Sequence, residues 1–258
     1  MRKHIAIVTG AHSGLGREFV KLLCGEKAVE EIWAIARSEE KLSQLHRDLG
    51  SKIRPIPLDL TRRESFSALE QLLVEEKPSV LYLINNAGFA KFGAAEDVGL
   101  EQSLDMMDLN MEAVVAVGLL CQPYLRRGSH LLNIASQASF FPLPYMNLYS
   151  ATKVFVRHYS RALGVELRPK GISVTAVCPG WMPTDLIPQG KTASQKGVTN
   201  FFGLVPPRAV AQKALQDAKK GRPLSVYGLY NKSSHLLSKV LPQRVLMRLW
   251  LIQQGHRS

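Results

Sequence analysis

Apolar and polar positions follow one another along the chain in a pattern that predicts strands and helices in alternation. Short apolar runs, typical of strands buried on both faces, occur at 5–8, 32–36, 53–58, 80–84, 131–136, 172–177 and 224–227. Stretches with helical spacing lie among them, at 17–23, 39–49, 64–76, 104–125, 149–163 and 208–219. This order predicts an α/β fold class: a Rossmann-like, doubly wound parallel sheet of about seven strands, with helices on both faces.

Two of these helices carry specific expectations. The stretch 104–125 is unusually apolar and is expected to form one helix with Asn110 near its start, where the buried amide needs a partner. The helix that begins near Tyr149 is expected to end at about Leu163, because Gly164 follows.

The last part of the chain departs from the alternating pattern. Residues 185–207 are rich in Gly, Pro, Lys, Ser and Thr, which predicts a flexible flap over a site. Beyond them, residues 231–258 interleave apolar and basic positions, and Pro242 divides this tail into two short amphipathic helices. We therefore predict one domain over 1–230 and a basic amphipathic helical extension over 231–258. Packing on its own domain or on a sister subunit is the favoured interpretation of this extension, and contact with a membrane surface is left open.

Composition narrows the class of protein. The chain has 258 residues, 46% of them hydrophobic, which is enough for a substantial core. A net charge of +12 raises nucleic acid, anionic membranes and phosphate-rich ligands as partners, but the basic residues are scattered and no nucleic-acid motif accompanies them. Cys24, Cys121 and Cys178 lie far apart, so neither a disulfide framework nor a metal site is expected. With no apolar run of signal-peptide or transmembrane length, we expect a cytoplasmic protein that binds no nucleic acid.

A glycine-rich turn follows the first strand. Gly10, Gly14 and Gly16 lie between the run 5–8 and the helix that begins near Arg17, where they permit a tight turn and close backbone approach. Unpaired N–H groups at such a helix start suit a pyrophosphate, although glycines here also serve simply for packing.

The end of the second strand points to a particular dinucleotide. An acidic residue near this place in dinucleotide-binding folds holds the ribose 2′-hydroxyl, whereas an arginine accommodates a 2′-phosphate. Ala36 is not acidic, and Arg37-Ser38 follows it. The sequence therefore favours NADP(H) over NAD(H), with an exposed loop arginine as the alternative.

Candidate catalytic residues lie where later strands end. Tyr149 and Lys153 are four positions apart and share one helix face, so the ammonium is expected to lower the pKa of the phenol. Ser136 ends the strand run 131–136, and Asn85-Asn86-Ala87-Gly88 follows the strand 80–84. A nucleophilic role for Ser136 is disfavoured because no Gly-x-Ser-x-Gly sequence surrounds it.

Taken together, these motifs resemble the short-chain dehydrogenase/reductase family, in its short single-domain branch, from Ile5 to about Thr184 and more loosely beyond. The match comprises the glycine turn, 85–88, Asn110, Ser136, Tyr149 with Lys153, and Pro179-Gly180 with Thr184, in the family's order. His12 stands where a small residue is common, which is a mild departure from the pattern.

The resemblance implies catalytic roles for four residues. Ser136 would hydrogen-bond a substrate carbonyl that Tyr149 protonates as hydride arrives, so both would also contact the substrate. Lys153 would lower the pKa of Tyr149 and bind the nicotinamide ribose, and Asn110 would help hold a water that relays protons to Lys153.

The resemblance also implies the cofactor contacts. Phosphate would meet Ser13 and Leu15, the 2′-phosphate Arg37, and the adenine Asp59 and Leu60, while 86–88 would meet the adenosine ribose and Met182 and Thr184 the carboxamide. The full set of implied NADP(H)-binding positions is Gly10, His12, Ser13, Gly14, Leu15, Gly16, Arg37, Asp59, Leu60, Asn86, Ala87, Gly88, Tyr149, Lys153, Pro179, Gly180, Met182 and Thr184.

The leading hypothesis is thus an NADP(H)-dependent oxidoreductase that interconverts a ketone and a secondary alcohol. Aromatic and apolar loop residues favour a lipophilic substrate, steroid-like or acyl-type; they are Phe89, Phe92, Phe140, Phe141, Pro142, Leu143, Tyr145, Phe201 and Phe202. The alternative is a non-catalytic NADPH-binding sensor or membrane-surface scaffold. The family implies a homodimer or homotetramer.

Overall fold

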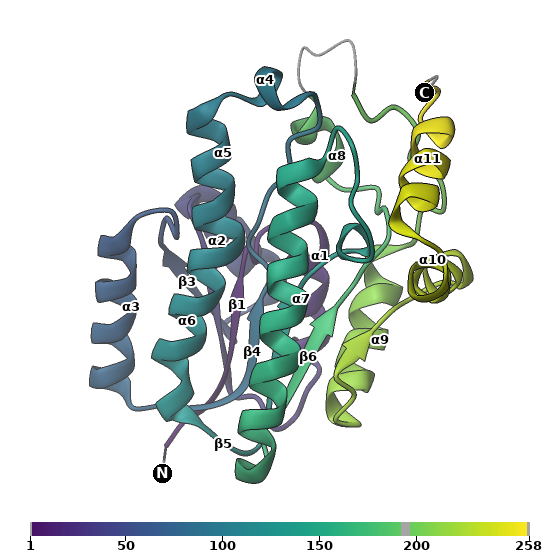
Figure 1. Ribbon diagram of the computed structural model, residues 1–258. Coiled ribbons are helices and arrows are strands. Elements are labelled where there is room, and N and C mark those ends of the chain that lie inside the picture. The colour runs from purple at the N-terminus through teal and green to yellow at the C-terminus, as the bar shows by residue number, and fades with distance from the viewer. Residues whose placement is uncertain (1, 192–196, 257–258) are drawn as a thin grey trace.

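A seven-stranded parallel sheet forms the centre of the computed structural model, which describes residues 2–191 and 197–256 (Figure 1). The strand order is β3-β2-β1-β4-β5-β6-β7, and every neighbouring pair is parallel. The strands are β1 (His4–Thr9), β2 (Glu31–Ala36), β3 (Ile53–Pro57), β4 (Ser79–Asn85), β5 (Leu125–Ile134), β6 (Ser173–Val177) and β7 (Leu224–Ser225). The predicted fold class is confirmed.

The strand order reverses between β1 and β4. After β1 the chain adds β2 and β3 on one side, and it then returns to add β4 to β7 on the other. At such a point the connections leave the carboxyl edge in opposite directions and open a crevice there, where ligands bind in open α/β sheets.

Helices cover both faces of the sheet. The larger ones are α1 (Gly14–Cys24), α2 (Glu39–Leu49), α3 (Arg63–Glu76), α5 (Leu100–Met107), α6 (Ala113–Cys121), α7 (Asn147–Leu167), α9 (Pro207–Lys219), α10 (Leu229–Val240) and α11 (Gln243–Gln253). Shorter helical segments are α4 (Ala95–Val98), η1 (Asp108–Glu112), η2 (Gln122–Tyr124), η3 (Gln137–Ser139), η4 (Arg168–Lys170) and α8 (Leu186–Gly190).

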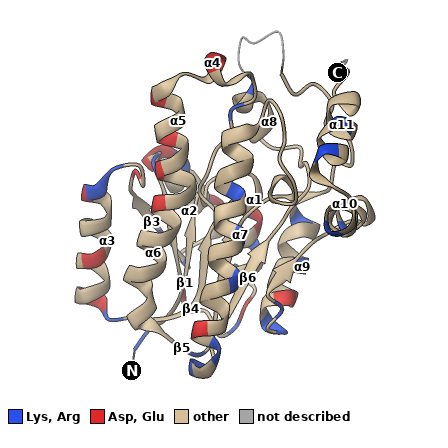
Figure 2. Ribbon diagram, viewed as in Figure 1, with Lys and Arg blue, Asp and Glu red and all other residues tan. Residues whose placement is uncertain are grey.

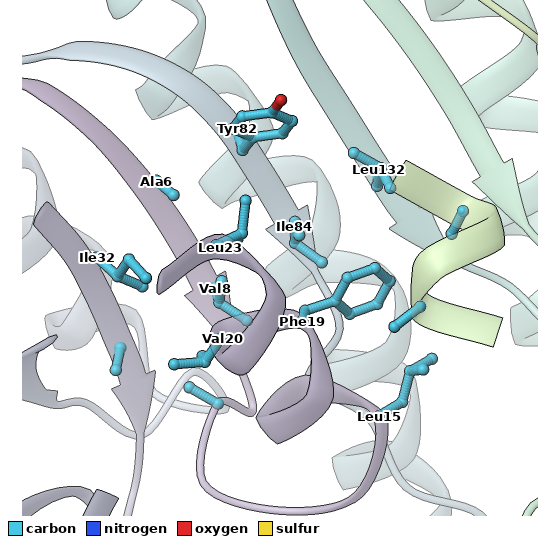
Figure 3. Packing of buried hydrophobic residues seen from close by; sticks show 14 of the residues in the cluster. Ala6, Val8, Leu15, Phe19, Val20, Leu23, Ile32, Tyr82, Ile84 and Leu132 are labelled. Carbon is cyan, nitrogen blue, oxygen red and sulfur yellow. The ribbon is translucent and has the colours of Figure 1, made fainter. Parts of the chain in front are cut away.

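The core consists of two layers, because side chains alternate between the two faces of each strand. On one face, Ala6 and Val8 of β1 pack with Phe19 and Val20 of α1, and α2 and α9 complete this layer (Figure 3). On the other face, the intervening residues of β1 pack with α3, α6 and α7. The period-2 alternation is invisible in the sequence because both faces are buried.

The stretch predicted as one helix over 104–125 is interrupted. A π-helical turn, η1, separates α5 from α6 and contains Asn110, whose side chain is fully buried. Asn110 Nδ2 donates to the carbonyl of Phe89 at 2.9 Å and its Oδ1 accepts from the Phe89 N–H at 3.0 Å. The expectation of a partner for Asn110 is confirmed. Such wide turns are frequent at functional sites.

The prediction that Gly164 ends its helix is wrong. α7 continues to Leu167 and stops where Pro169 and Gly171, with φ of 73°, follow. A Cβ on Gly164 would lie 3.5 Å from Val174 Cβ of β6. Packing of α7 on the sheet therefore outweighs the low helix propensity of one glycine.

The end of the chain forms the two predicted helices, α10 and α11, with Pro242 between them. Their inner residues Asn231, Leu246 and Trp250 are buried, so one face of the extension packs on its own domain. The domain boundary at residue 230 stays a prediction. Within 2–191 and 197–256, no helix combines the length and apolarity needed to cross a bilayer.

Substitution of two glycines by alanine compares a position with room for a methyl group, Gly164, with a position that has none, Gly16. Gly164→Ala is expected to raise the free energy of unfolding by about 0.5–1 kcal/mol, since the added methyl group makes an ordinary contact with Val174 and alanine favours helix. Gly16→Ala is expected to lower it by about 1–3 kcal/mol, since its methyl group would collide with the Gly10 carbonyl oxygen. Urea unfolding of both variants measures the difference, and a destabilised Gly164→Ala protein would contradict this account of α7.

Candidate active site

A cavity of about 380 Å³ opens at the carboxyl edge of the sheet, where the strand order reverses. Arg37 and Lys41 line the part that follows β2, which we call the basic end, and a group of apolar side chains lines the part that we call the apolar end. Ser136, Tyr149 and Lys153 line the same cavity. The cavity thus contains basic, apolar and candidate catalytic residues.

The glycine turn brings backbone close to the cavity. Gly10 and Gly14 have φ of 62° and 50°, in the left-handed region that favours glycine. Asn86 Nδ2 donates to the carbonyl of Thr9 at 3.0 Å, and Thr9 Oγ1 accepts the N–H groups of Asn86 and Ala87 at 2.9 Å each. These bonds tie the carboxyl end of β1 to that of β4.

The start of α1 has the properties of an anion site. Ser13 precedes the helix without capping it through its side chain, and the first turn contains no acidic residue. The N–H groups there point toward the helix start with the positive end of the helix dipole. Together with the positive φ of Gly10 and Gly14, this cradle fits a pyrophosphate.

Cations outweigh the one nearby carboxylate, Asp185, in their effect on His12 at the basic end of the cavity. Burial, followed by the charges of Lys41 and Arg37, lowers the pKa of His12. His12 Nδ1 is buried and has no hydrogen-bond partner among the described residues. A dianionic 2′-phosphate fits this charge and can supply the missing partner.

Tyr149 and Lys153 both line the cavity from α7, one helical turn apart. Tyr149 is 6% exposed and Lys153 4%, so both polar groups are nearly removed from solvent. Lys153 Nζ donates to the Ile134 carbonyl at 2.9 Å and lies 5.7 Å from the centre of the Tyr149 ring.

Burial dominates the ionisation of this pair. It raises the pKa of Tyr149 to about 12, with a smaller opposing effect from a hydrogen bond with Ser136. It lowers the pKa of Lys153 to about 8. The net shift of the Tyr149 pKa is therefore upward, against the lowering expected from the sequence, and Tyr149 is a neutral phenol near pH 7 in the protein chain alone. The contribution of Lys153 to this pKa stays a prediction.

Ser136 stands beside Tyr149 at the end of β5. Its Oγ accepts a hydrogen bond from the Ala138 N–H at 3.1 Å, and this bond caps the start of η3. The Ser136 side chain also hydrogen-bonds with Tyr149. Two hydroxyl groups on the cavity wall thus face the same space, and a substrate oxygen could accept from both.

Asn110 lies behind this wall. Besides Phe89, its Nδ2 contacts Thr152 Oγ1 at 3.1 Å, one residue from Lys153. A Cβ on Gly88 would lie 2.7 Å from Asn110 Oδ1 and 3.3 Å from Lys153 Nζ. Only glycine fits at position 88 without displacing these two polar groups.

The apolar end of the cavity is formed mainly by apolar side chains. The side chains there come from the segments after β4, β5 and β6 and from the last helix; they are Phe89, Ala90, Phe141, Leu143, Met146, Trp181, Leu186 and Trp250. A few polar groups interrupt them, namely Gln137, Gln189, Tyr230, Ser234 and Gln253.

Comparison with known proteins identifies the family. The family model described as short chain dehydrogenase matches residues 4–195. An uncharacterized oxidoreductase of Staphylococcus epidermidis is 27% identical over 188 residues, covering 72% of this chain and 81% of that protein. The uncharacterized oxidoreductase YusZ of Bacillus subtilis is 32% identical over 195 residues, covering 72% of this chain and 68% of that protein. The chain belongs to the short-chain dehydrogenase/reductase family.

Solved structures of similar proteins have the same fold. A short-chain dehydrogenase from Sphingobium yanoikuyae in complex with NADPH is 24% identical with a TM-score of 0.76, covering 93% of this chain and 97% of that one. The closed form of a serine dehydrogenase complexed with NADP+ is 25% identical with a TM-score of 0.74, covering 86% and 94%. The protein is an oxidoreductase of the short-chain dehydrogenase/reductase family, with a nicotinamide dinucleotide as its cofactor.

Most residues that the sequence assigns to the site of this short-chain dehydrogenase line the cavity. They are Gly10, His12, Ser13, Gly14, Leu15, Arg37, Leu60, Asn86, Ala87, Gly88, Ser136, Tyr149, Lys153, Pro179, Gly180, Met182 and Thr184. Three do not: Gly16 packs under Gly10, Asn110 lies behind the wall, and Asp59 Oδ1 accepts from the N–H and hydroxyl of Thr61. The roles of all these residues in binding and catalysis stay predictions.

The aromatic residues expected at the crevice have different positions. Phe89 and Phe141 line the cavity. Phe92, Phe140 and Phe201 pack in the core instead; Phe140, for example, packs against His235 of α10 at 4.5 Å between ring centres. Tyr145 is not part of the cavity lining and packs against His256, and Phe202 is exposed. More of these aromatic residues thus anchor the loops than line the cavity.

Sequence reasoning missed the part of the wall that comes from α10 and α11. Trp250 is 6% exposed and its Nε1 donates to the Pro144 carbonyl at 3.0 Å, while Tyr230, Ser234 and Gln253 also line the cavity. The repeat of Leu246, Trp250 and Gln253 along one helix face was the signal of an inward side.

The described parts of the predicted flap over 185–207 include regular structure, and its flexibility stays a prediction. α8 lies within it, Leu186 and Gln189 line the cavity, and the ring of Phe92 packs where a Cβ on Gly190 would lie. The part at 192–196 lies outside the described residues.

Removal of the buried ammonium is expected to stabilise the protein. At pH 7, Lys153→Met should raise the free energy of unfolding by about 2 kcal/mol, because the lowered pKa means that folding costs energy while the lysine is protonated. This gain should shrink as the pH rises from about 8 toward 10.5, where the unfolded chain also loses its proton. Urea unfolding at several pH values, with exposed Lys170→Met as control, measures it; a gain that is independent of pH would contradict the buried charge.

Proposed function

We propose that the protein is an NADP(H)-dependent oxidoreductase that interconverts a ketone and a secondary alcohol on a lipophilic substrate. The observation that carries the proposal is the position of Tyr149, Ser136 and Lys153. These three polar side chains stand together on the wall, between the cradle at α1 and the apolar end of the cavity. The bound nicotinamide supplies or accepts a hydride at the substrate carbon.

Tyr149 is suited to donate a proton. With its pKa raised to about 12, it holds its proton at neutral pH, which is the form that ketone reduction requires. Ser136 can hydrogen-bond the same substrate oxygen and hold it in place, because it already contacts Tyr149. The raised pKa therefore means that Tyr149 is in its proton-donating form at neutral pH.

Lys153 supports this role through its charge. After Tyr149 gives up its proton, the phenolate has a cation 5.7 Å from the ring centre. The ammonium is fixed by the Ile134 carbonyl and is shielded from water, so its effect on the phenolate is stronger than it would be at the surface.

The preference for NADP(H) rests on the basic end of the cavity. Arg37 and Lys41 line it, no acidic residue stands at the end of β2, and His12 Nδ1 has no described partner. An acid there would repel a 2′-phosphate, whereas two cations attract it. The serine dehydrogenase, 25% identical, whose structure contains NADP+ is consistent with this choice.

The class of substrate follows from the apolar end of the cavity. Its side chains are mainly apolar, and Trp250 and Trp181 give it two large aromatic walls. A lipophilic ketone, steroid-like or acyl-type, would bury its apolar surface there, while a sugar would leave its hydroxyl groups with few partners.

A homodimer or homotetramer is part of the proposal. Exposed apolar side chains lie on neighbouring helices of one side of the molecule, namely Leu100, Leu104 and Met107 of α5, Leu119 of α6, and Phe155 and Val165 of α7. A second copy of the chain would cover them.

Loss of the phenol hydroxyl tests the catalytic role. Tyr149→Phe is expected to reduce kcat with NADPH and a lipophilic ketone by at least about 100-fold, because the phenyl ring has no proton to give to the substrate oxygen. NADPH binding, measured by fluorescence titration, should be nearly unchanged. Tyr159→Phe, on the same helix but away from the cavity, is the control, and retained turnover in Tyr149→Phe would refute the assignment.

Reversal of charge at Arg37 tests the cofactor preference. Arg37→Asp is expected to weaken NADPH binding roughly tenfold or more, because a charge-assisted bond is lost and a repulsion is added. NADH binding should be retained or improved. Titration of both dinucleotides measures the ratio, with Arg47→Asp, exposed on α2 outside the cavity wall, as control; an unchanged ratio would count against the 2′-phosphate site.

A further inference from the structure

The outer surface of α10 and α11 combines two unusual features. Large apolar side chains are exposed along it, one or two helical turns apart: Leu229, Leu236 and Val240 on α10, and Val245, Leu249 and Ile252 on α11. Phe202, which is 57% exposed, extends this surface and packs against Tyr230 of α10 at 5.0 Å between ring centres. We call these exposed residues the outer face.

The charges of this surface are all of one sign. From Ala218 to the end of the chain the sequence contains no Asp or Glu, while α10 and α11 contain Lys232, Lys239, Arg244 and Arg248. All four side chains are exposed. Among the described residues, no ion pair involves either helix. Figure 2 shows blue segments and no red ones along α10 and α11.

The two helices are firmly attached to the domain by their inner side. Trp250 donates to Pro144, and the buried Gln254 side chain binds the backbone of Thr199 and Asn200 through three hydrogen bonds of 2.9–3.0 Å. The exposure of the outer face is therefore a property of a fixed surface.

We propose that the outer face of α10 and α11 binds the surface of an anionic lipid bilayer. The apolar side chains enter the interface between headgroups and acyl chains, and the four cations meet lipid phosphates. The two helices lie together at one edge of the molecule, beyond the last strand, where a flat surface can reach them (Figure 1).

Charge decides between a bilayer and a second copy of the chain. In a two-fold dimer the same patch meets itself, so four cations would face four cations with no carboxylate on either helix to balance them. An anionic bilayer supplies the opposite charge. The chemistry of the outer face thus fits lipid better than it fits itself.

The location of the outer face also has a consequence for the cavity. The helices that carry it line the apolar end of the cavity on their inner side with Tyr230, Ser234, Trp250 and Gln253. A protein bound in this way holds the apolar end of its cavity one helix away from the acyl chains. The docking proposal itself does not depend on the proposed function.

Sedimentation with vesicles tests the proposal without substrate or dinucleotide. The full-length protein is expected to sediment with vesicles of phosphatidylcholine and phosphatidylglycerol, and not with phosphatidylcholine alone. Lys239→Glu/Arg248→Glu should weaken this partition by at least about tenfold. Arg168→Glu/Lys170→Glu, two exposed cations at the far end of α7, should leave it unchanged.

A matched pair of apolar substitutions tests the contribution of the apolar side chains to vesicle binding. The two residues are Leu249, on the outer face, and Val74, on α3. Their side chains are almost equally exposed, at 52% and 53%. Leu249→Ser should weaken the partition roughly fivefold and Val74→Ser should not change it. Equal partition of the wild type and Lys239→Glu/Arg248→Glu would overturn the proposal. So would light scattering in which Leu249→Ser turns a dimer into a monomer while vesicle binding is unchanged.

Discussion

The candidate active site is arranged around a buried ammonium group. Lys153 is 4% exposed and is held by one described hydrogen bond, to the Ile134 carbonyl. Its pKa is lowered to about 8 by burial, so the fold tolerates an unfavourable charge there at neutral pH. The surrounding groups accommodate this charge: Gly88 leaves room for it, and Asn110 holds the neighbouring loop by two hydrogen bonds to Phe89. A less buried lysine would cost less and would stabilise a phenolate on Tyr149 less.

Close packing of the backbone also shapes the end of the cavity that is expected to bind the dinucleotide. The sheet brings the ends of β1 and β4 together, and Thr9 and Asn86 bond across them. Gly10 and Gly16 then lie so close that a methyl group on Gly16 would strike the carbonyl of Gly10. Gly16 was predicted to bind the cofactor, but in the structure it lets α1 begin directly at the cavity. Close backbone packing is thus one way in which this glycine serves the site, and its contact with the cofactor stays a prediction.

Sequence reasoning succeeded where a pattern reflects a local or repeated constraint. The buried parallel strands are one example, and the strand count and fold class were predicted from them. The glycine turn and the spacing of Tyr149 and Lys153 on one helix are two others. It failed where tertiary packing decides. The sequence could not show that α7 continues through Gly164, because the closeness of Val174 is a property of the sheet beneath it. Nor could it show the direction of the pKa shift of Tyr149, because burial depends on segments distant in the chain.

The C-terminal helices illustrate how one amphipathic pattern can have two uses. The sequence indicated an apolar face with interspersed cations, and packing on the domain was the favoured interpretation. In the structure Leu246 and Trp250 use one side of α11 in that way, while Leu249 and Ile252 remain exposed on the other. A helix that packed only on its own domain would have polar residues at those positions. The exposed apolar side chains lie among cations that form no ion pair with any described residue. An anionic bilayer would both cover the apolar side chains and pair with the cations.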